Sequence, residues 1–185
     1  MKNQVIEGYF VELIPYGIDF VEDVLRLRNT ESAKYFLNQT EDLTVEKQLL
    51  WTKKYLEKND DLYWMIRTKK EKTIIGTTAL YDINAESCEK GRLIVDKEYR
   101  NTKPYVLDAE LLILNLAFDV LKVKTVKTCT KVDNSNMQSI NSKFGFTFEK
   151  NILIRNEAYN YYRLEESNFL DTKLKKTLLH WAKRE

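Results

Sequence analysis

Residues 88–121 read CEKGRLIVDKEYRNTKPYVLDAELLILNLAFDVL, and this stretch joins a strand, a charged turn and the most apolar helix of the chain. The first part, 88–96, is rich in β-forming residues and is predicted to be a strand. The last part, 105–121, is apolar on nearly every side, which is typical of a helix buried in the middle of its domain. Pro104 stands where a proline favours the first helical turn. We therefore expect a fold organised around one strand-to-helix turn.

The rest of the chain predicts six more strands and four more helices. The strands are expected at 8–14, 62–68, 73–83, 125–132, 146–150 and 158–165. The helices are expected at 19–29, from Thr44 to Leu56, at 134–143 and, in the tail, at 169–182. The strands within 62–96 should form an antiparallel meander that feeds a strand–helix–strand unit. The sheet is then mixed and mostly antiparallel, with about seven strands, four flanking helices and an extra C-terminal helix, in the α/β class or α+β by some schemes.

Composition limits the kind of protein. A chain of 185 residues suits one domain, and its net charge of +2 is too balanced to indicate a nucleic-acid partner. The N-terminus has no signal-peptide pattern, and the longest apolar run is interrupted by Asp108 and Glu110, so we expect no membrane span. Cys88, Cys129 and the single His180 make no metal-ligand spacing. No metal is expected, and reduced thiols favour a cytoplasmic location.

The turn DKEYRNTKPY, at 96–105, has features of a phosphate site. A short strand-to-helix turn presents backbone amides and the positive end of a helix dipole. Arg100 and Lys103 add formal positive charge to these groups. The alternative interpretation is an exposed loop with two incidental cations, and the turn by itself leaves both interpretations open.

The order of elements over residues 8–165 resembles the GNAT superfamily, whose members transfer an acetyl group from acetyl-CoA to an amine. Its signature is an apolar strand, then Gln or Arg, two residues, Gly, one residue, and Gly or Ala opening a long helix. Arg100 takes the Gln or Arg position here, while Lys103 and Tyr105 stand at the two glycine positions. Both add a Cβ where glycine would let a pyrophosphate approach the backbone. The resemblance implies coenzyme contacts from Ile94, Val95, Arg100, Asn101, Thr102, Lys103, Pro104 and Tyr105.

A second motif, NSNMQSINSKFGF at 134–146, resembles the family's "N, ten residues, G-F" helix and turn. The resemblance implies that Asn134 points at the pantetheine arm of CoA, while an ordinary helix cap is the alternative. Lys143 in the last turn is also expected at the coenzyme. Asn141 stands where many members carry a tyrosine that protonates the leaving thiolate, so it is expected at the coenzyme and at the catalytic centre. A CoA thiol with a pKa of about 8.5 leaves without a strong acid.

A third motif, ESCEKGRLIVD, resembles the "E-x-G" strand of the ribosomal-protein and antibiotic N-acetyltransferase branch. The longer stretch IIGTTALYDINAESCEKGRLIVD also resembles the branch that acetylates amino groups of nucleotide-linked sugars. Glu89 occupies the position often used as general base, and strand alternation places Gly91 on the same side. A carboxylate in a partly desolvated cleft suits removal of a proton from an amine. The alternative is a surface glutamate paired with Lys90 or Arg92.

The acceptor is expected to be a primary amine of a small molecule, with a nucleotide-linked amino sugar as one candidate. Trp64, Tyr81 and Glu89 are predicted to bind it, although alternation sends Tyr63 and Trp64 to opposite faces. An N-terminal alanine, an aminoglycoside or a polyamine are the rivals within the family. The last two acceptors favour acidic sites, for which Asp60, Asp61, Asp82 and Glu86 are available; these acids are equally well explained as turn residues.

A hypothesis of another class is a GNAT-fold binding or scaffold module, in which Lys103 and Tyr105 close the coenzyme site. The basic tail, KLKKTLLHWAKRE, would then be its interaction surface. We instead expect one GNAT domain over residues 1–168, with 169–185 forming an amphipathic helix packed on it through Leu174, Leu178 and Trp181. The last strand, AYNYYRLE, is expected to be exposed and would allow a homodimer.

Overall fold

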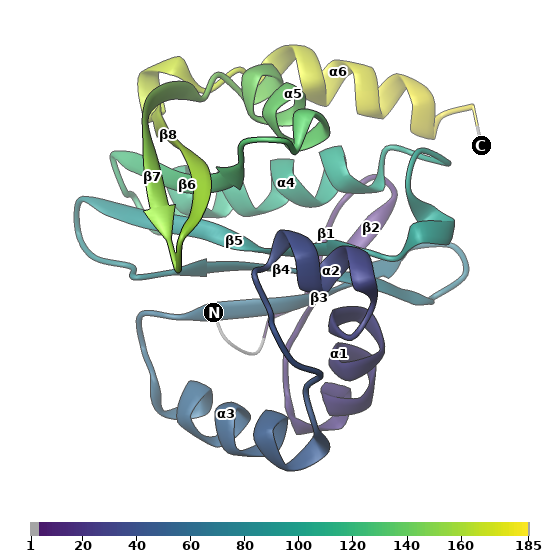
Figure 1. Cartoon of the computed structure of the whole chain (residues 1–185). Helices are drawn as coiled ribbons and strands as arrows, with labels where there is room; N and C mark the ends of the chain where they lie inside the picture. The colour runs from purple at the N-terminus through teal and green to yellow at the C-terminus, as the bar shows by residue number, and fades with distance from the viewer. Residues whose placement is uncertain (1–3, 185) are drawn as a thin grey trace.

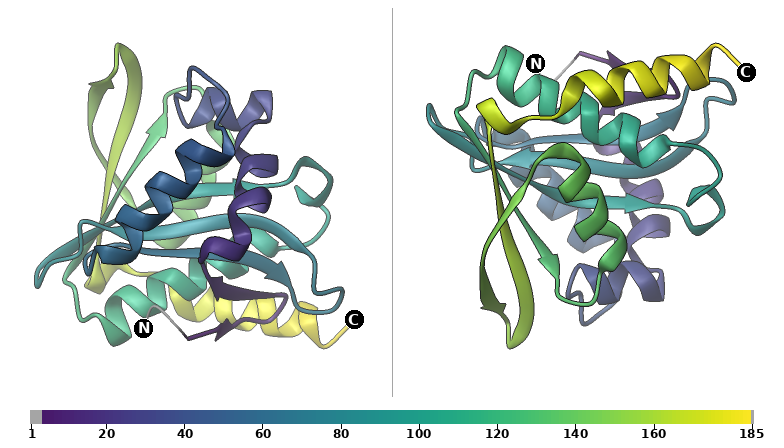
Figure 2. Two further views of the ribbon diagram at one scale, coloured as in Figure 1. Left: turned by 90° about the horizontal axis from the view of Figure 1, so that it is seen from below. Right: turned by 90° about the horizontal axis from the view of Figure 1, so that it is seen from above.

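The computed structural model describes residues 4–184, and in this part of the chain one eight-stranded sheet lies between two layers of helices (Figures 1 and 2). The strands are β1 (Ile6–Glu7), β2 (Val11–Pro15), β3 (Leu62–Thr68), β4 (Ile74–Tyr81), β5 (Ser87–Val95), β6 (Thr125–Lys131), β7 (Thr147–Ile154) and β8 (Glu157–Glu165). The helices are α1 (Val21–Arg28), α2 (Glu31–Phe36), α3 (Val45–Glu57), α4 (Tyr105–Asn115), α5 (Ser135–Phe144) and α6 (Asp171–Ala182).

The sheet has the order β1-β2-β3-β4-β5-β6-β8-β7. Its described neighbours are antiparallel except β5 and β6, which run parallel because α4 carries the chain back between them. This confirms the predicted meander and the mixed sheet. The strand count rises from about seven to eight because the two-residue β1 pairs with β2. The edge strands of the described sheet are β1 and β7, whereas the predicted last strand, 158–165, forms β8 inside the sheet; a homodimer stays a prediction.

One helix, α2, was not predicted. It has only six residues, so a periodic apolar pattern has little room to develop. Its N-cap is Thr30, whose Oγ1 accepts a hydrogen bond from the amide of Ala33 at 3.3 Å. The predicted helix start at Thr44 is confirmed by the same kind of bond, from the amide of Lys47 to Thr44 Oγ1 at 3.3 Å.

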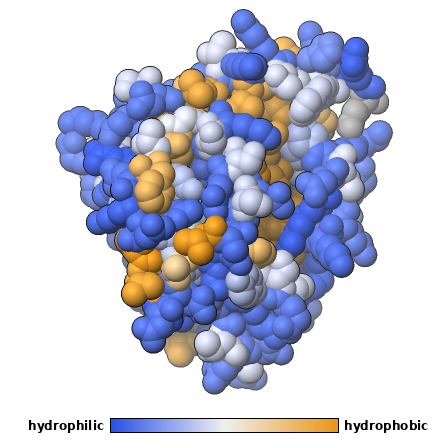
Figure 3. All heavy atoms as spheres, turned by 45° about the horizontal axis from the view of Figure 1, so that its top comes forward, coloured by the Kyte–Doolittle hydropathy of each residue, from blue (hydrophilic) through white to orange (hydrophobic). Residues whose placement is uncertain are grey.

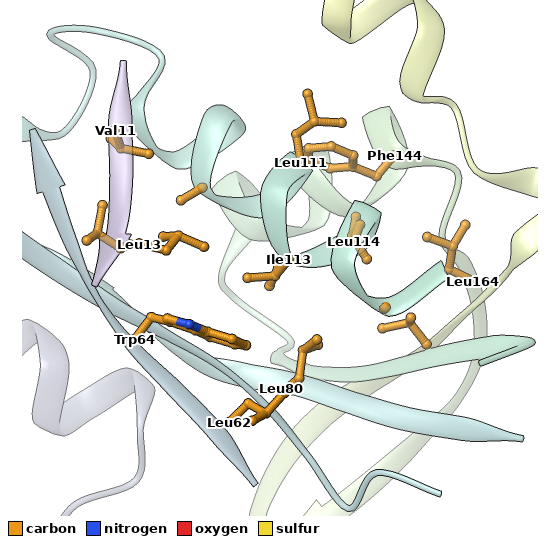
Figure 4. Packing of buried hydrophobic residues seen from close by; sticks show 14 of the residues in the cluster. Val11, Leu13, Leu62, Trp64, Leu80, Leu111, Ile113, Leu114, Phe144 and Leu164 are labelled. Atoms are coloured by element: carbon orange, nitrogen blue, oxygen red, sulfur yellow. The ribbon is translucent and has the colours of Figure 1, made fainter. Parts of the chain in front are cut away.

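The main core lies between the sheet and α4. Trp64 from β3 is 1% exposed and packs with Leu80 of β4 beneath Ile113 and Leu114 of α4 (Figure 4). Helix α4 is buried as its sequence predicts, and α6 covers it from outside. A second, smaller cluster lies on the other face of the sheet, beneath α1 and α3. The sheet therefore separates an apolar interior from a face rich in tyrosine.

Helix α6 packs on α4 through a narrower face than expected. Leu178 is 1% exposed and Leu174 is partly buried against the core, as predicted. Trp181, predicted on the same face, is 42% exposed, and Ala182 contacts the core instead. Within residues 4–184, no helix combines the length and apolar character needed to cross a membrane.

Candidate active site

The sheet opens between β5 and β6. The two strands pair over three positions only, the last of which joins Glu89 to Lys127, although β5 continues to Val95. Beyond that point lies a cleft of about 360 Å³, bounded by β5, α2, α4 and α5. The space-filling view shows apolar atoms recessed between hydrophilic side chains on one face of the molecule (Figure 3). The parallel pair thus ends where a ligand can enter between the two halves of the sheet.

The lining of the cleft combines an apolar wall with positively charged side chains. The apolar wall consists of Leu93, Ile94, Val106, Leu107, Met137 and Ile140. Arg100, Lys103 and Lys143 also line the cleft, and no carboxylate of the described residues does. Such a lining fits a ligand that combines an uncharged chain with phosphate groups. The residues present therefore fit coenzyme A.

The predicted turn reaches the cleft in part. Arg100, Asn101, Lys103 and Pro104 line it, as do Ile94 and Val95 of β5. Arg100 is fixed by two hydrogen bonds, from Nε to the carbonyl of Val95 at 2.7 Å and from Nη1 to Ser32 Oγ at 3.0 Å. Its guanidinium therefore joins the turn to α2 as well as lining the cleft.

Two predicted residues of the turn face elsewhere. The Tyr105 side chain is 4% exposed and packs in the core, with its ring centroid 6.1 Å from that of Tyr99. Thr102 Oγ1 donates to the carbonyl of Tyr99 at 3.0 Å. Neither side chain lines the cleft. Tyr105 therefore does not close the coenzyme site, because its bulk is accommodated in the core.

Helix α5 supplies the opposite wall. Asn134 is its N-cap, accepting from the amide of Met137 at 3.2 Å, and it lines the cleft together with Lys143. Asn141 is placed differently from the prediction. It is 0% exposed, and its Nδ2 donates to Thr130 Oγ1 at 3.1 Å, so it lies behind the cleft lining and joins α5 to β6. Gly145 ends the helix with φ of 95°, in the left-handed region that favours glycine.

Helix α2 spans the opening of the sheet. Ser32, Ala33 and Phe36 line the cleft from this helix. On the β6 side, the Tyr35 hydroxyl donates to Asp133, and Lys131 Nζ lies 3.7 Å from the centroid of the Tyr35 ring. Together with the bond between Arg100 and Ser32, these contacts hold α2 to both sides of the cleft.

Glu89 lies on β5 at the end of the opening where β5 and β6 still pair. Tyr81 Oη donates to Glu89 Oε1 at 2.8 Å. The ring of Tyr81 lies over Gly91, where an added Cβ would meet Tyr81 Oη at 2.7 Å. Burial raises the pKa of the Glu89 carboxyl, and the bond from Tyr81 opposes that rise. Glu89 does not pair with Lys90 or Arg92, which was the alternative for this residue.

Arg92 occupies a position that alternation did not predict. The pairing of β4 with β5 shifts between Thr77 and Ala79, and Arg92 has φ of 52° at this bulge. The extra residue turns Arg92 to the same side of the sheet as Tyr81. Its Nη1 and Nη2 donate to Asp61 at 2.6 and 2.9 Å. Burial lowers the pKa of Arg92, but the bonds and charge of Asp61 outweigh it and the pKa is raised.

Aromatic rings surround this guanidinium. The centre of the Arg92 guanidinium lies 4.7 Å from the ring centroid of Tyr81, 5.3 Å from Trp51 and 5.6 Å from Tyr63. Trp64, predicted to bind substrate, lies instead in the core on the opposite face of the sheet. The alternation of β3 was right, but Tyr63 rather than Trp64 faces Arg92.

A phosphate-compatible cleft and a half-buried carboxylate thus share strand β5, an arrangement that suits transfer of a group from a phosphorylated coenzyme to a nucleophile. The model of the acetyltransferase (GNAT) domain matches residues 11–147. The chain therefore belongs to the GNAT acetyltransferase family and is an acyl-CoA N-acyltransferase. No curated protein matches it.

Solved structures share the fold over nearly the whole chain. A GCN5-related N-acetyltransferase from Brucella melitensis is 20% identical over 97% of this chain and 86% of its own, with a TM-score of 0.77. FdhC, a nucleotide-linked sugar GNAT, is 20% identical over 97% of both chains, with a TM-score of 0.76. Spermidine N-acetyltransferase from Vibrio cholerae, in complex with CoA and spermine, is 16% identical over 86% of this chain and 98% of its own, with a TM-score of 0.77.

Proposed function

We propose that this enzyme transfers an acetyl group from acetyl-CoA to a primary amine of a small molecule, with Glu89 as general base. The observation that carries the proposal is the position of Glu89 at the last pairing of β5 with β6, on the same strand as Leu93, Ile94 and Val95, which line the coenzyme cleft. Acetyl-CoA supplies the activated acyl thioester. Arg100, Lys103 and Lys143 bind its phosphates, and Asn134 binds its pantetheine arm.

The reaction needs one proton transfer before the new bond forms. A primary amine is protonated at neutral pH, and the Glu89 carboxylate accepts that proton directly or through one water. The freed lone pair attacks the acyl carbon, the C–N bond forms, the C–S bond breaks, and the departing thiolate takes up the second proton that the nitrogen loses. The thiol of CoA has a pKa of about 8.5, so it leaves without a strong acid. This agrees with Asn141 being buried against Thr130 rather than lining the cleft.

The environment of Glu89 suits this role. Burial raises the pKa of its carboxyl, and the raised pKa makes the carboxylate a better proton acceptor. The bond from Tyr81 Oη favours the charged form and holds the carboxylate in one orientation. We infer that Tyr81 is a positioning residue for Glu89 and a wall of the acceptor site.

Two acceptor classes come from the relatives named above. FdhC is described as a nucleotide-linked sugar enzyme, which supports an amino sugar that carries phosphate. The Vibrio cholerae enzyme contains spermine, which supports a polyamine. The two classes have opposite charge, so the charges of this chain's acceptor side discriminate between them.

The test of the proposed function has a binding arm and a kinetic arm. CoA should raise the midpoint of thermal unfolding, and release of free thiol from acetyl-CoA should identify the accepted amine from a panel. With that amine, Glu89→Gln should lower kcat by about 10²-fold or more and leave the Kd of CoA within about twofold. Glu86→Gln is the matched control, because Glu86 is an exposed residue of the preceding turn that pairs with Lys124. Full activity of Glu89→Gln at neutral pH would show that Glu89 is not the base.

A further inference from the structure

Arg28 is a half-buried cation without a carboxylate partner. It is the last residue of α1, and its Nε donates to Gln39 Oε1 at 3.2 Å. Burial lowers the pKa of Arg28, the nearby Tyr63 opposes that effect, and the charge of Arg92 lowers it further. Arg28 therefore lies on the face of the sheet beneath α1, near enough to Tyr63 and Arg92 for their charges to act on it.

Other buried cations of the protein are compensated. Lys90 pairs with Glu110 and Lys131 pairs with Glu157. Asp61, the acid paired with Arg92, has both of its carboxylate oxygens bound to that guanidinium. No ion pair involves Arg28 in the part of the chain that the structure describes. A desolvated charge without a partner is costly, so a ligand that compensates it explains why the site holds an arginine.

The surroundings of Arg28 belong to the acceptor side. The coenzyme cleft is lined from α2 onward and does not include Arg28. Arg28 instead lies toward Tyr63 and Arg92, on the face of the sheet that also carries Tyr81. The anion that would compensate Arg28 is therefore not the pyrophosphate of CoA.

We propose that Arg28 and Arg92 form an anion subsite for the acceptor, so that the amine substrate carries a phosphate ester or a carboxylate. This inference rests on the proposed function. A guanidinium offers a planar fork of N–H donors that matches both anions. Arg92 is oriented by Asp61 and by the rings of Trp51 and Tyr81, whereas Arg28 supplies the uncompensated charge.

The same charges argue against a polyamine. A polycationic acceptor would meet two guanidinium groups, and like charges at a binding site oppose association. Asp61, one of the acids considered for a cationic acceptor, is 2% exposed and bound to Arg92. Of the other acids considered for that purpose, Glu86 pairs with Lys124 at the surface. Apart from the carboxylate of Glu89 and the nearby Asp82, this side thus keeps the positive charge of Arg28 uncompensated, and an anionic group of the acceptor fits that charge.

The first test measures anion binding without turnover. Thermal unfolding is followed with saturating CoA, so that the coenzyme cleft is filled, and with sodium phosphate or sodium acetate against sodium chloride at equal ionic strength. At concentrations near ten times Kd, phosphate should raise the midpoint of the wild type by about 3 °C beyond its general salt effect. Arg28→Met should lose this increment. Arg26→Met is the matched control, because Arg26 lies on the same helix but is exposed and paired with Asp96.

The anions also distinguish the two sources. A response to phosphate but not to acetate assigns a phosphate ester, and a response to both assigns the subsite to carboxylates as well. An equal response of Arg28→Met and wild type to every anion would overturn the proposal, because the general effect of salt would then account for the whole shift.

The second test uses turnover. Thiol release from acetyl-CoA is compared for glucosamine, glucosamine 6-phosphate and spermidine. We expect kcat/KM for the phosphorylated amine to exceed that for glucosamine by about tenfold or more, and Arg28→Met to remove this preference. Faster turnover of spermidine than of either sugar would overturn the subsite. Absence of thiol release with every amine of a wide panel would instead count against the proposed function, and the anion-binding result would remain interpretable by itself.

Discussion

Two buried cation–carboxylate pairs start from β5, two residues apart, and they lie on opposite faces of the sheet. Lys90 pairs with Glu110 of α4, and the two side chains are 3% and 1% exposed. Arg92 pairs with Asp61, and these side chains are 24% and 3% exposed. The first pair is enclosed by the core, whereas the second is walled by aromatic rings and keeps one side open. The difference teaches that access, rather than burial of charge, separates a functional pair from a structural one.

The largest effect is expected from breaking the enclosed pair. Lys90→Met leaves Glu110 without its partner in the core, and the free energy of unfolding should fall by about 3–5 kcal/mol. Urea unfolding measures the loss, and kcat/KM of the remaining folded enzyme should stay within about twofold. Lys90→Met combined with Glu110→Leu should regain most of the stability, because a well-packed apolar pair replaces the ions. A double variant as unstable as the single one would contradict this account.

A smaller loss of stability, joined to a loss of activity, is expected for the open pair. Arg92→Met leaves the buried Asp61 without its partner, beside a position that is itself partly open to water, and the free energy of unfolding should fall by about 1–3 kcal/mol. Because Arg92 also forms the acceptor wall, kcat/KM for the acceptor should fall about tenfold or more, with the Kd of CoA unchanged. Arg92→Lys should have a stability and a kcat/KM between those of the wild type and of Arg92→Met, since lysine keeps the charge but not the bidentate geometry. Equal behaviour of the two pairs, in stability and in activity, would remove the distinction.

The smallest effect is expected from removing the hydrogen bond by which Tyr81 lowers the pKa of Glu89. Tyr81→Phe removes the donor to Glu89, and loss of a hydrogen bond to the charged form raises the pKa of that carboxyl. Activity needs the carboxylate, so the acid limb of kcat/KM should move to higher pH by about half to one unit. Gly91→Ala should produce the same shift, because its Cβ would displace Tyr81 Oη. An acid limb unmoved in both variants would contradict the positioning role.

Assigning the acid limb to Glu89 requires that the other charged or polar groups near it be considered. Asp82 raises the pKa of Glu89, while Lys127 and Arg92 lower it. Burial is the main cause of the raised pKa values of Cys129, to about 11, and of Tyr161, and the charge of Glu89 raises both further. Neither group ionises in the neutral range, so the limb is assigned to Glu89.

Local pattern was sufficient for most of the fold. The apolar helix at 105–121, the meander strands and the left-handed Gly145 all depend on residues near one another in sequence, and each is found. The six-residue α2 and the two-residue β1 were missed because neither is long enough to show periodicity. The same limit explains why the wall of the cleft formed by Phe36 was not foreseen.

The site was harder to predict, since its geometry depends on partners far apart in the chain. The pattern of β3 separated Tyr63 from Trp64 correctly, but which face is apolar is decided by α4 and α1. The side that Arg92 faces could not be read from alternation, because a bulge in the pairing of β4 with β5 reverses it. The pairing of Arg92 with Asp61 spans 31 residues, and no local signal in the sequence indicates it. Arg28 was not singled out for the same reason.

The short pairing of β5 with β6, over three positions only, also bears on which segments of the gene could recombine with those of a relative. The acceptor-side residues Arg28, Tyr81 and Arg92 precede it in the chain, while the phosphate-binding turn and α5 follow it. An exchange of gene segments near residue 95 would therefore bring a new acceptor side to an old coenzyme side and disturb few backbone pairings. A viable recombinant has to keep the contacts that cross this boundary, among them the bond between Arg100 and Ser32 of α2 and the buried pair of Lys90 with Glu110.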